Sequence, residues 1–107
     1  MKLTQIITAS TPSLSFEVFP PKTSVSFDSV RMATEEIAKL NPSYMSVTYG
    51  AGGGTSEYTV AIAENLKNKF GVTPLAHLTC VSSTKEDVEK KLVELKSHGI
   101  ENILALR

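Results

Sequence analysis

The sequence predicts an α/β fold in which four parallel β-strands alternate with three helices. Four apolar runs begin near Leu14, Tyr44, Pro74 and Ile103, so successive runs start about 30 residues apart. Each interval has room for one helix, and strands joined in this way pair in parallel through right-handed crossovers. The predicted strands lie near residues 14–19, 44–49, 74–79 and 102–107.

Apolar residues at helical spacing predict a helix in each interval. The first two stripes are Phe27, Val30, Ile37 and Leu40, and then Ile62, Ala63, Leu66 and Phe70. Gly71 follows the second stripe and is a typical helix terminator. The third helix is expected to begin with a capping box at Ser83-Thr84-Lys85-Glu86, to carry the stripe Val88, Leu92 and Leu95, and to end at Gly99.

The spacing of the strands fits both a (β/α)8 barrel, which averages about 31 residues per unit, and an open doubly wound sheet. Side chains along a strand alternate between the two faces of its sheet. One face receives Ser15, Glu17, Ser46, Thr48, Leu75, His77 and Thr79, and the other receives Phe16, Val18, Met45, Val47, Ala76 and Leu78. The second face suits a covering of helices, whereas the first suits a barrel interior with a binding site at its C-terminal rim. The alternation therefore favours half of a (β/α)8 barrel.

The composition is that of one globular domain with a small-molecule partner. The chain has 107 residues, of which 41% are hydrophobic and 21% charged, and its formal net charge is zero. Zero net charge argues against nucleic acid or an anionic membrane as the main partner. Cys80 is the single cysteine, no metal-ligand spacing occurs, and no apolar run approaches the roughly 20 residues of a membrane-spanning helix. Because the opening residues also lack the apolar stretch of a signal peptide, we expect a cytoplasmic protein.

Polar side chains occur where each predicted strand ends. Glu17 lies near the end of the first run, Thr48 and Tyr49 close the second, His77 and Thr79 the third, and Arg107 the fourth. A charge is costly beside apolar residues unless it has a function or a partner. A catalytic role for Glu17 is the favoured hypothesis, and a structural carboxylate paired with lysine or arginine is the alternative.

The histidines and the cysteine also have structural explanations. His77 is either a hydrogen-bonded core histidine or a site residue, and the residues around it do not decide between the two. His98, beside Gly99 at a helix end, is expected to interact favourably with the helix dipole. Cys80 is expected to be a small buried apolar residue.

A glycine-rich segment, Gly50-Ala51-Gly52-Gly53-Gly54-Thr55, follows the second strand and precedes a helix. Free amides and a helix N-terminus at such a place can receive an anionic or carbonyl-bearing ligand. The segment lacks the spacing of nucleotide-binding glycine motifs, so a flexible connection is an equal alternative. A small α/β module that binds a nucleotide or phosphate through this segment is therefore a further hypothesis.

Four segments together resemble the methylenetetrahydrofolate reductase family in its bacterial, single-domain form. They are SFEVFPPKT from Ser15, SVTYGAGG from Ser46, HLTC from His77 and NILALR from Asn102, in the order and spacing of the family. The resemblance spans about residues 13–107. It implies a (β/α)8 barrel that holds FAD, in agreement with the pattern of strands and helices above.

The resemblance implies an oxidoreductase of one-carbon and methionine metabolism. Hydride would pass from NADH or NADPH through FAD to 5,10-methylenetetrahydrofolate, giving 5-methyltetrahydrofolate. Glu17 matches the family's catalytic glutamate, the general acid that helps to open the imidazolidine ring of the folate. The barrel mouth and the flat flavin would favour its protonated form by excluding water.

The same resemblance implies contacts with the cofactors. Thr48 would lie where nicotinamide and flavin meet, and Tyr49 and Ala51 would contact FAD. His77 would help to hold FAD, and Arg107 would touch the flavin, where a cation favours the reduced, anionic form. The full-length form is expected to be a homo-oligomer.

The chain stops at Arg107, where the family pattern continues with Gly-Asp and four more strands. Residues 1–107 are therefore expected to be the N-terminal half of such a barrel, as a fragment. A catalytically incomplete half-barrel is the alternative to an active enzyme. Because its first and fourth strands would be open edges, we expect the isolated chain to dimerise, aggregate or pack loosely.

Overall fold

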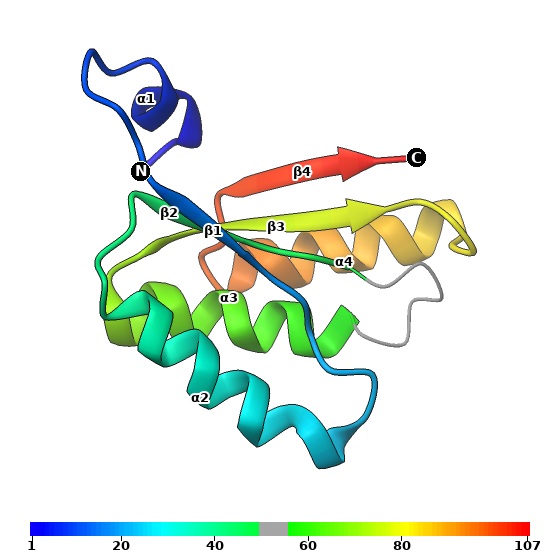
Figure 1. Ribbon diagram of the computed structural model, residues 1–107. Helices are drawn as coiled ribbons and strands as arrows, with labels where there is room; N and C mark the ends of the chain where they lie inside the picture. The colour runs from blue at the N-terminus through cyan, green and yellow to red at the C-terminus, as the bar shows by residue number, and fades with distance from the viewer. Residues whose placement is uncertain (50–55) are drawn as a thin grey trace.

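A computed structural model describes residues 1–49 and 56–107, which form a four-stranded parallel sheet with helices between the strands (Figure 1). The strands are β1 (Ser15–Val18), β2 (Tyr44–Val47), β3 (Thr73–Thr79) and β4 (Asn102–Leu106). The helices are α1 (Leu3–Ile7), α2 (Phe27–Ala38), α3 (Ser56–Phe70) and α4 (Lys85–Ser97), and a 3-10 turn, η1 (Ser24–Ser26), leads into α2. All four predicted strands are confirmed, with small differences at their ends.

The order of the strands decides between the two folds that the spacing allowed. The strands are hydrogen-bonded in the order β1-β2-β3-β4, and every neighbouring pair is parallel. A doubly wound sheet reverses its order at a switch point and carries helices on both faces, whereas a (β/α)8 barrel keeps consecutive order with its helices outside. Here α2, α3 and α4 pack along one face (Figure 1), so the described chain has the architecture of half a (β/α)8 barrel.

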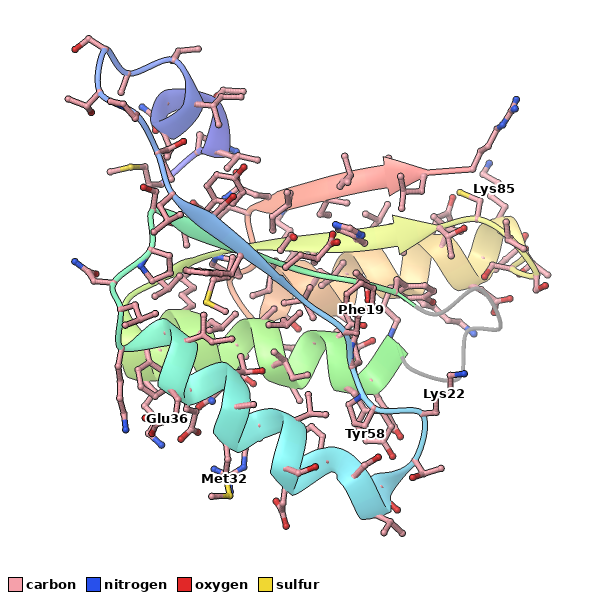
Figure 2. All side chains as sticks on the ribbon, in the orientation of Figure 1. Phe19, Lys22, Met32, Glu36, Tyr58 and Lys85 are labelled. Atoms are coloured by element: carbon pink, nitrogen blue, oxygen red, sulfur yellow. The ribbon has the colours of Figure 1, made fainter. Side chains whose placement is uncertain are left out.

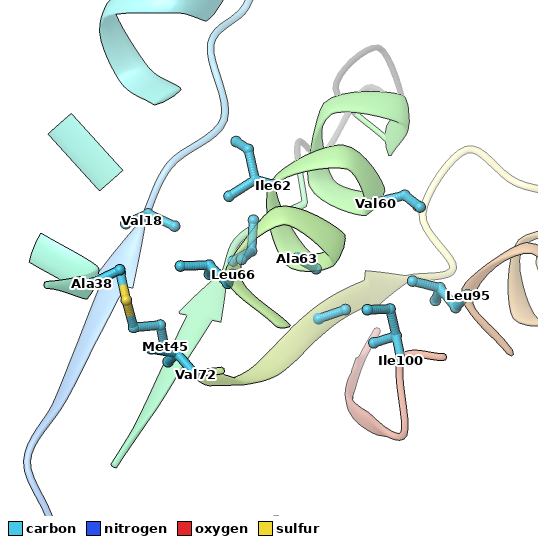
Figure 3. Close-up of a cluster of buried hydrophobic side chains, with 12 residues drawn as sticks. Val18, Ala38, Met45, Val60, Ile62, Ala63, Leu66, Val72, Leu95 and Ile100 are labelled. Atoms are coloured by element: carbon cyan, nitrogen blue, oxygen red, sulfur yellow. The ribbon is translucent and has the colours of Figure 1, made fainter. Parts of the chain in front are cut away.

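The sheet face beneath these helices forms the hydrophobic core (Figure 3). Met45 and Val47 of β2, Ala76 of β3, and Ala63 and Leu66 of α3 are completely shielded from solvent. The same cluster includes Val18, Ala38, Val60, Ile62, Val72, Leu95 and Ile100. Full burial of a large apolar side chain stabilises by about 1.5–3 kcal/mol, so this face holds the helices to the sheet. The alternation of side chains predicted from the sequence is confirmed.

Two leucines of the predicted helical stripes lie outside the core. Leu40 has an exposed fraction of 67% because α2 ends at Ala38 and the chain then turns through Asn41, whose φ is 55°. Leu92 is 40% exposed on the flank of α4, whereas Leu95 on the same helix is 1% exposed. The predicted stripes were therefore too long in the first helix and too wide in the third.

The capping box of α4 lies one residue later than predicted. The Asp87 N–H donates to Thr84 Oγ1 across 3.1 Å, and the Thr84 N–H donates to the Asp87 carboxylate across 2.9 Å. The prediction of Ser83 as the cap and Glu86 as its partner is therefore wrong. The hydrogen bond from the Thr84 backbone is the main reason why the pKa of Asp87 is lowered.

Helices α3 and α4 end at glycines, as predicted. Gly71 and Gly99 have φ angles of 66° and 72°. Residues with a Cβ atom adopt such positive φ angles only with strain, whereas glycine adopts them freely. His98 precedes Gly99, and its backbone N–H donates to the Glu94 carbonyl across 3.1 Å. Its Nδ1 lies 3.0 Å from Glu64 Oε2, so the histidine at this helix end also links α4 to α3.

The N-terminal residues lie beside the start of β4. Asn102 Oδ1 accepts a hydrogen bond from the Leu3 N–H across 2.7 Å, and Asn102 Nδ2 donates to the Met1 carbonyl across 3.0 Å. The Met1 ammonium lies 3.2 Å from Glu101 and lowers the pKa of that carboxyl. These contacts place α1 at the N-terminal end of the sheet, away from the strand ends that carry the candidate residues (Figure 1).

Within residues 1–49 and 56–107, the structure has no helix with both the length and the apolar character needed to cross a membrane.

Candidate functional site

The sheet face opposite the helices carries the candidate polar residues, and we call it the open face. Residues in register on neighbouring strands share a face, and alternate residues along each strand follow them. The open face consists of Ser15, Glu17, Tyr44, Ser46, Thr73, Leu75, His77, Thr79, Asn102, Leu104 and Leu106. Its carboxyl-terminal edge is where ligands bind in parallel α/β barrels.

Glu17 has two polar partners on the strands beside it. Ser46 Oγ donates a hydrogen bond to Glu17 Oε1 across 3.3 Å, and His77 Nε2 lies 3.4 Å from the same oxygen. Ser46 is in register with Glu17 on β2, and His77 projects from β3, so three consecutive strands contribute to one cluster. Among the described residues, the ion-pair partner of Glu17 is thus a histidine rather than the lysine or arginine of the structural alternative.

The members of this cluster differ in exposure. The Glu17 side chain is 47% exposed and the His77 side chain 10%. Glu17 belongs to β1, which is an edge strand, whereas His77 belongs to β3, which has a strand on either side. The carboxyl group is therefore open to solvent and to ligands, and the imidazole is held within the sheet.

In the described part of the chain, no group of three or more histidine, cysteine, aspartate or glutamate side chains could hold a metal ion.

The chain beyond β1 borders this cluster at the carboxyl-terminal edge of the sheet. Phe19 and Lys22 extend into solvent there, and Phe19 is 68% exposed (Figure 2). At the base of this connection, the ring centroids of Phe27 and Tyr58 lie 5.3 Å apart. This contact joins the start of α2 to α3 and fixes the end of the loop that follows Glu17.

Thr48 and Tyr49 follow β2 at the same edge. The Thr48 N–H donates to the Val18 carbonyl across 3.0 Å, and the Thr48 carbonyl accepts a hydrogen bond from Thr59 Oγ1 across 2.9 Å. These bonds tie the end of β2 to β1 and to α3. Tyr49 lines a hollow of about 300 Å³ between the end of β3 and the first turns of α4. Ala51 and the remainder of the glycine-rich segment lie outside the described residues.

Arg107 comes to this edge at the end of β4. The Cys80 N–H donates to the Leu106 carbonyl across 3.4 Å, so the residues that follow β3 and β4 lie close together. Arg107 is exposed. Cys80 is exposed as well, which corrects the expectation of a buried apolar residue. The reason is that Cys80 lies one residue beyond β3, outside the core that the helices cover.

Exposed leucines flank the polar cluster. Leu104 is in register with His77, and Leu106 is in register with Thr79. Each of these leucines is 41% exposed, although its side chain is fully apolar. Apolar surface beside the imidazole of His77 and the hydroxyl of Thr79 suits a small-molecule ligand with both apolar and polar parts.

Two features of this cluster went unnoticed in the sequence. Ser46 was placed on the correct face, but only the register of β1 and β2 brings its hydroxyl to Glu17. The exposed apolar surface of Leu104 and Leu106 was also missed, because their run resembles any buried strand. Counting equal distances from the predicted strand starts, Leu14 and Tyr44, would have aligned Glu17 with Val47, whereas the register pairs it with Ser46. The sequence also holds no signal for the exposed leucines.

The fold and the open face define a class of protein, the (β/α)8 barrel with a ligand site at the carboxyl ends of its strands. The family model for methylenetetrahydrofolate reductase matches residues 2–107, and the chain belongs to this family. The resemblance seen in the sequence is therefore confirmed.

Curated relatives agree with the family model. A probable methylenetetrahydrofolate reductase (NADH) of Oryza sativa subsp. japonica is 39% identical over 93 residues, which cover 87% of this chain and 16% of the relative. The 5,10-methylenetetrahydrofolate reductase of Escherichia coli (strain K12) is 34% identical over 95 residues, which cover 89% of this chain and 32% of the relative. The chain thus spans a third or less of the length of these relatives.

Proposed function

We propose that this chain forms the N-terminal half of the active site of a flavin-dependent reductase that converts 5,10-methylenetetrahydrofolate into 5-methyltetrahydrofolate. The observation that carries the proposal is the position of Glu17, whose carboxyl group stands on the open face in contact with Ser46 and His77. Family membership supports the reaction, because the rice and Escherichia coli relatives are named for it. The cytoplasmic location and the homo-oligomeric state of the whole protein stay predictions.

FAD fits the open face. Its isoalloxazine ring is flat, with apolar faces and polar edges, and Leu104 and Leu106 offer exposed apolar surface beside the polar atoms of His77 and Thr79. When bound, FAD would supply hydride transfer between NADH or NADPH and the folate. The name of the rice relative specifies NADH, which makes NADH the first donor to test.

Glu17 is the proposed general acid. Opening the imidazolidine ring of the substrate requires a proton on the departing nitrogen, and a positioned carboxylic acid can deliver it. A ligand that covers the open face removes water from around Glu17, which is 47% exposed in the free chain. This loss of water favours the neutral, proton-bearing carboxyl group that the reaction needs.

The remaining predicted residues would bind the cofactors. Thr48, Tyr49 and Ala51 follow β2, and His77 and Arg107 come from β3 and the end of β4. The guanidinium group of Arg107 would favour the reduced, anionic flavin through its charge. The backbone N–H of Thr48 donates to the Val18 carbonyl, and its carbonyl accepts from the Thr59 hydroxyl, which suits a residue that positions a ligand.

A chimeric reductase tests the proposal, in which residues of this chain replace the matching segment of the Escherichia coli relative. In this chimera, Glu17→Gln keeps the shape of the side chain but removes the acidic proton. We expect NADH to reduce the bound flavin at an unchanged rate. Reoxidation by methylenetetrahydrofolate should slow by about 10²-fold or more, the typical contribution of a general acid. Anaerobic stopped-flow absorbance of the flavin measures both rates.

Glu64→Gln is the matched control. Glu64 also lies 3.0 Å from a histidine, His98, but this pair joins α3 to α4. Both rates should be unchanged in the control. Undiminished reoxidation in Glu17→Gln would show that another group is the acid.

A further inference from the structure

Two contacts converge on one oxygen of Glu17 and leave the other open. Ser46 Oγ and His77 Nε2 both approach Oε1, at 3.3 Å and 3.4 Å. Within the described residues, Glu17 Oε2 has no hydrogen-bond partner. The carboxyl group is therefore oriented, with Oε1 toward the sheet and Oε2 available to a ligand.

We propose that His77 returns a proton to Glu17 in each turnover and that Ser46 holds the carboxyl group in line for this transfer. The inference rests on the proposed function, because it concerns how the general acid regains the proton that it gives to the folate. After that step Glu17 is a carboxylate. The Nε2–H bond of a protonated His77 then breaks, an O–H bond forms at Oε1, and the neutral imidazole takes a new proton from solvent.

Rotation about the Cγ–Cδ bond of Glu17 exchanges Oε1 and Oε2. The new proton then faces the ligand, and one proton from solvent is consumed in each cycle. A distance of 3.4 Å is somewhat long for proton transfer, but catalytic hydrogen bonds are often long before substrate binds and shorten in the complex.

The surroundings of His77 favour this role over a purely structural one. Among the described residues, the ionisable side chain in contact with it is Glu17 on β1. Ser46 stands between them on β2, and the register partner of His77 on β4 is Leu104, which carries no charge. An imidazole ring can both accept and donate a proton, as this transfer requires. Because its side chain is only 10% exposed, its position relative to Glu17 is set by the sheet.

Half-reactions of the chimeric reductase separate a proton-transfer role from a role in holding flavin. His77→Gln keeps a hydrogen-bonding side chain that cannot carry a proton. We expect reoxidation by methylenetetrahydrofolate to fall by about 10²-fold, whereas reduction by NADH falls much less. Imidazole added to the buffer should restore part of the reoxidation rate of His77→Ala. The matched control His98→Gln should leave both rates unchanged.

Several results would overturn the inference. If reoxidation is unchanged in His77→Gln, the proton comes from elsewhere, and if both half-reactions fall equally, His77 only holds the flavin. These results differ from a failure of the proposed function, in which Glu17→Gln itself would leave reoxidation unchanged.

A second measurement uses the 107-residue chain and requires no turnover. The ¹⁵N resonance of His77 Nε2 should move in Glu17→Gln and, by a smaller amount, in Ser46→Ala. Glu64→Gln should instead move only the resonances of His98. If the His77 resonance does not respond to Glu17→Gln, the two side chains do not interact and the relay is excluded.

Discussion

The two faces of the sheet come from the same strands but serve opposite purposes. On the helix-covered face, Met45 and Val47 have no exposed surface. On the open face, Leu104 and Leu106 are 41% exposed, although they are as apolar as the core residues. The two faces therefore differ in what covers them as well as in composition. The covered face stabilises the fold, and the uncovered face keeps Glu17 accessible to a ligand.

Shortening one side chain on each face of the sheet should give the largest difference between the two faces, measured as the loss in free energy of unfolding. Met45→Ala leaves a cavity in the core and should lower the free energy of unfolding by about 2–5 kcal/mol. Leu104→Ala removes a side chain that is already 41% exposed, and should lower it by less than about 1 kcal/mol. Denaturant unfolding of the dilute, monomeric chain, followed by circular dichroism, measures both values. Equal losses would mean that the open face is covered in solution.

The open face and the edge strands β1 and β4 should also drive self-association of the isolated chain. Its apparent mass is expected to rise with concentration in size-exclusion chromatography with light scattering. Leu106→Lys places a charge on the edge strand β4 and should weaken association by about tenfold or more, as expected from the loss of one buried leucine.

Val93→Lys is the control for this charge, because Val93 is 68% exposed on α4 and lies away from the open face. It should leave association unchanged. A chain that stays monomeric at every concentration and binds FAD tightly would contradict this prediction.

The smallest effect concerns an ion-pair network on the covered side. Hydrogen bonds from Asn65 and Lys69, with a further one from Arg31, lower the pKa of Glu35. In the unfolded chain the glutamate carboxyl group has a pKa of about 4.3. The network therefore stabilises the fold above that pH, and this stabilisation is lost as the pH falls through the lower pKa of Glu35 in the folded chain. Glu35→Gln should therefore lower Tm at pH 7, with the difference shrinking below about pH 4.

Thermal melts at pH 7 and at pH 3 check this prediction. The neighbouring Glu36→Gln removes a carboxylate whose side chain is 71% exposed, and it should change Tm less. A difference for Glu35→Gln that is as large at pH 3 as at pH 7 would show that the carboxylate charge is not involved.

Sequence patterns predicted the structure correctly where the residues of a single segment determine it. Both glycine terminators and the alternation of core residues along the strands are confirmed. The errors occurred where neighbouring segments decide. Leu40 continued an apolar stripe but the helix had already ended, and Cys80 lies just past its strand in an exposed position. Serine and threonine are both favourable N-cap residues. Only the backbone conformation shows that Thr84 rather than Ser83 is the N-cap of α4.

The order of amino acids determined by itself where strands and helices lie and which side chains share a face. These features follow from the short repeat periods of strands and helices, which depend on nearby residues. Only the tertiary structure decided that β1, β2 and β3 stand in consecutive order, so that Glu17, Ser46 and His77 meet. Contacts between distant segments depend on the order and register in which the strands pair, and no local pattern encodes the register.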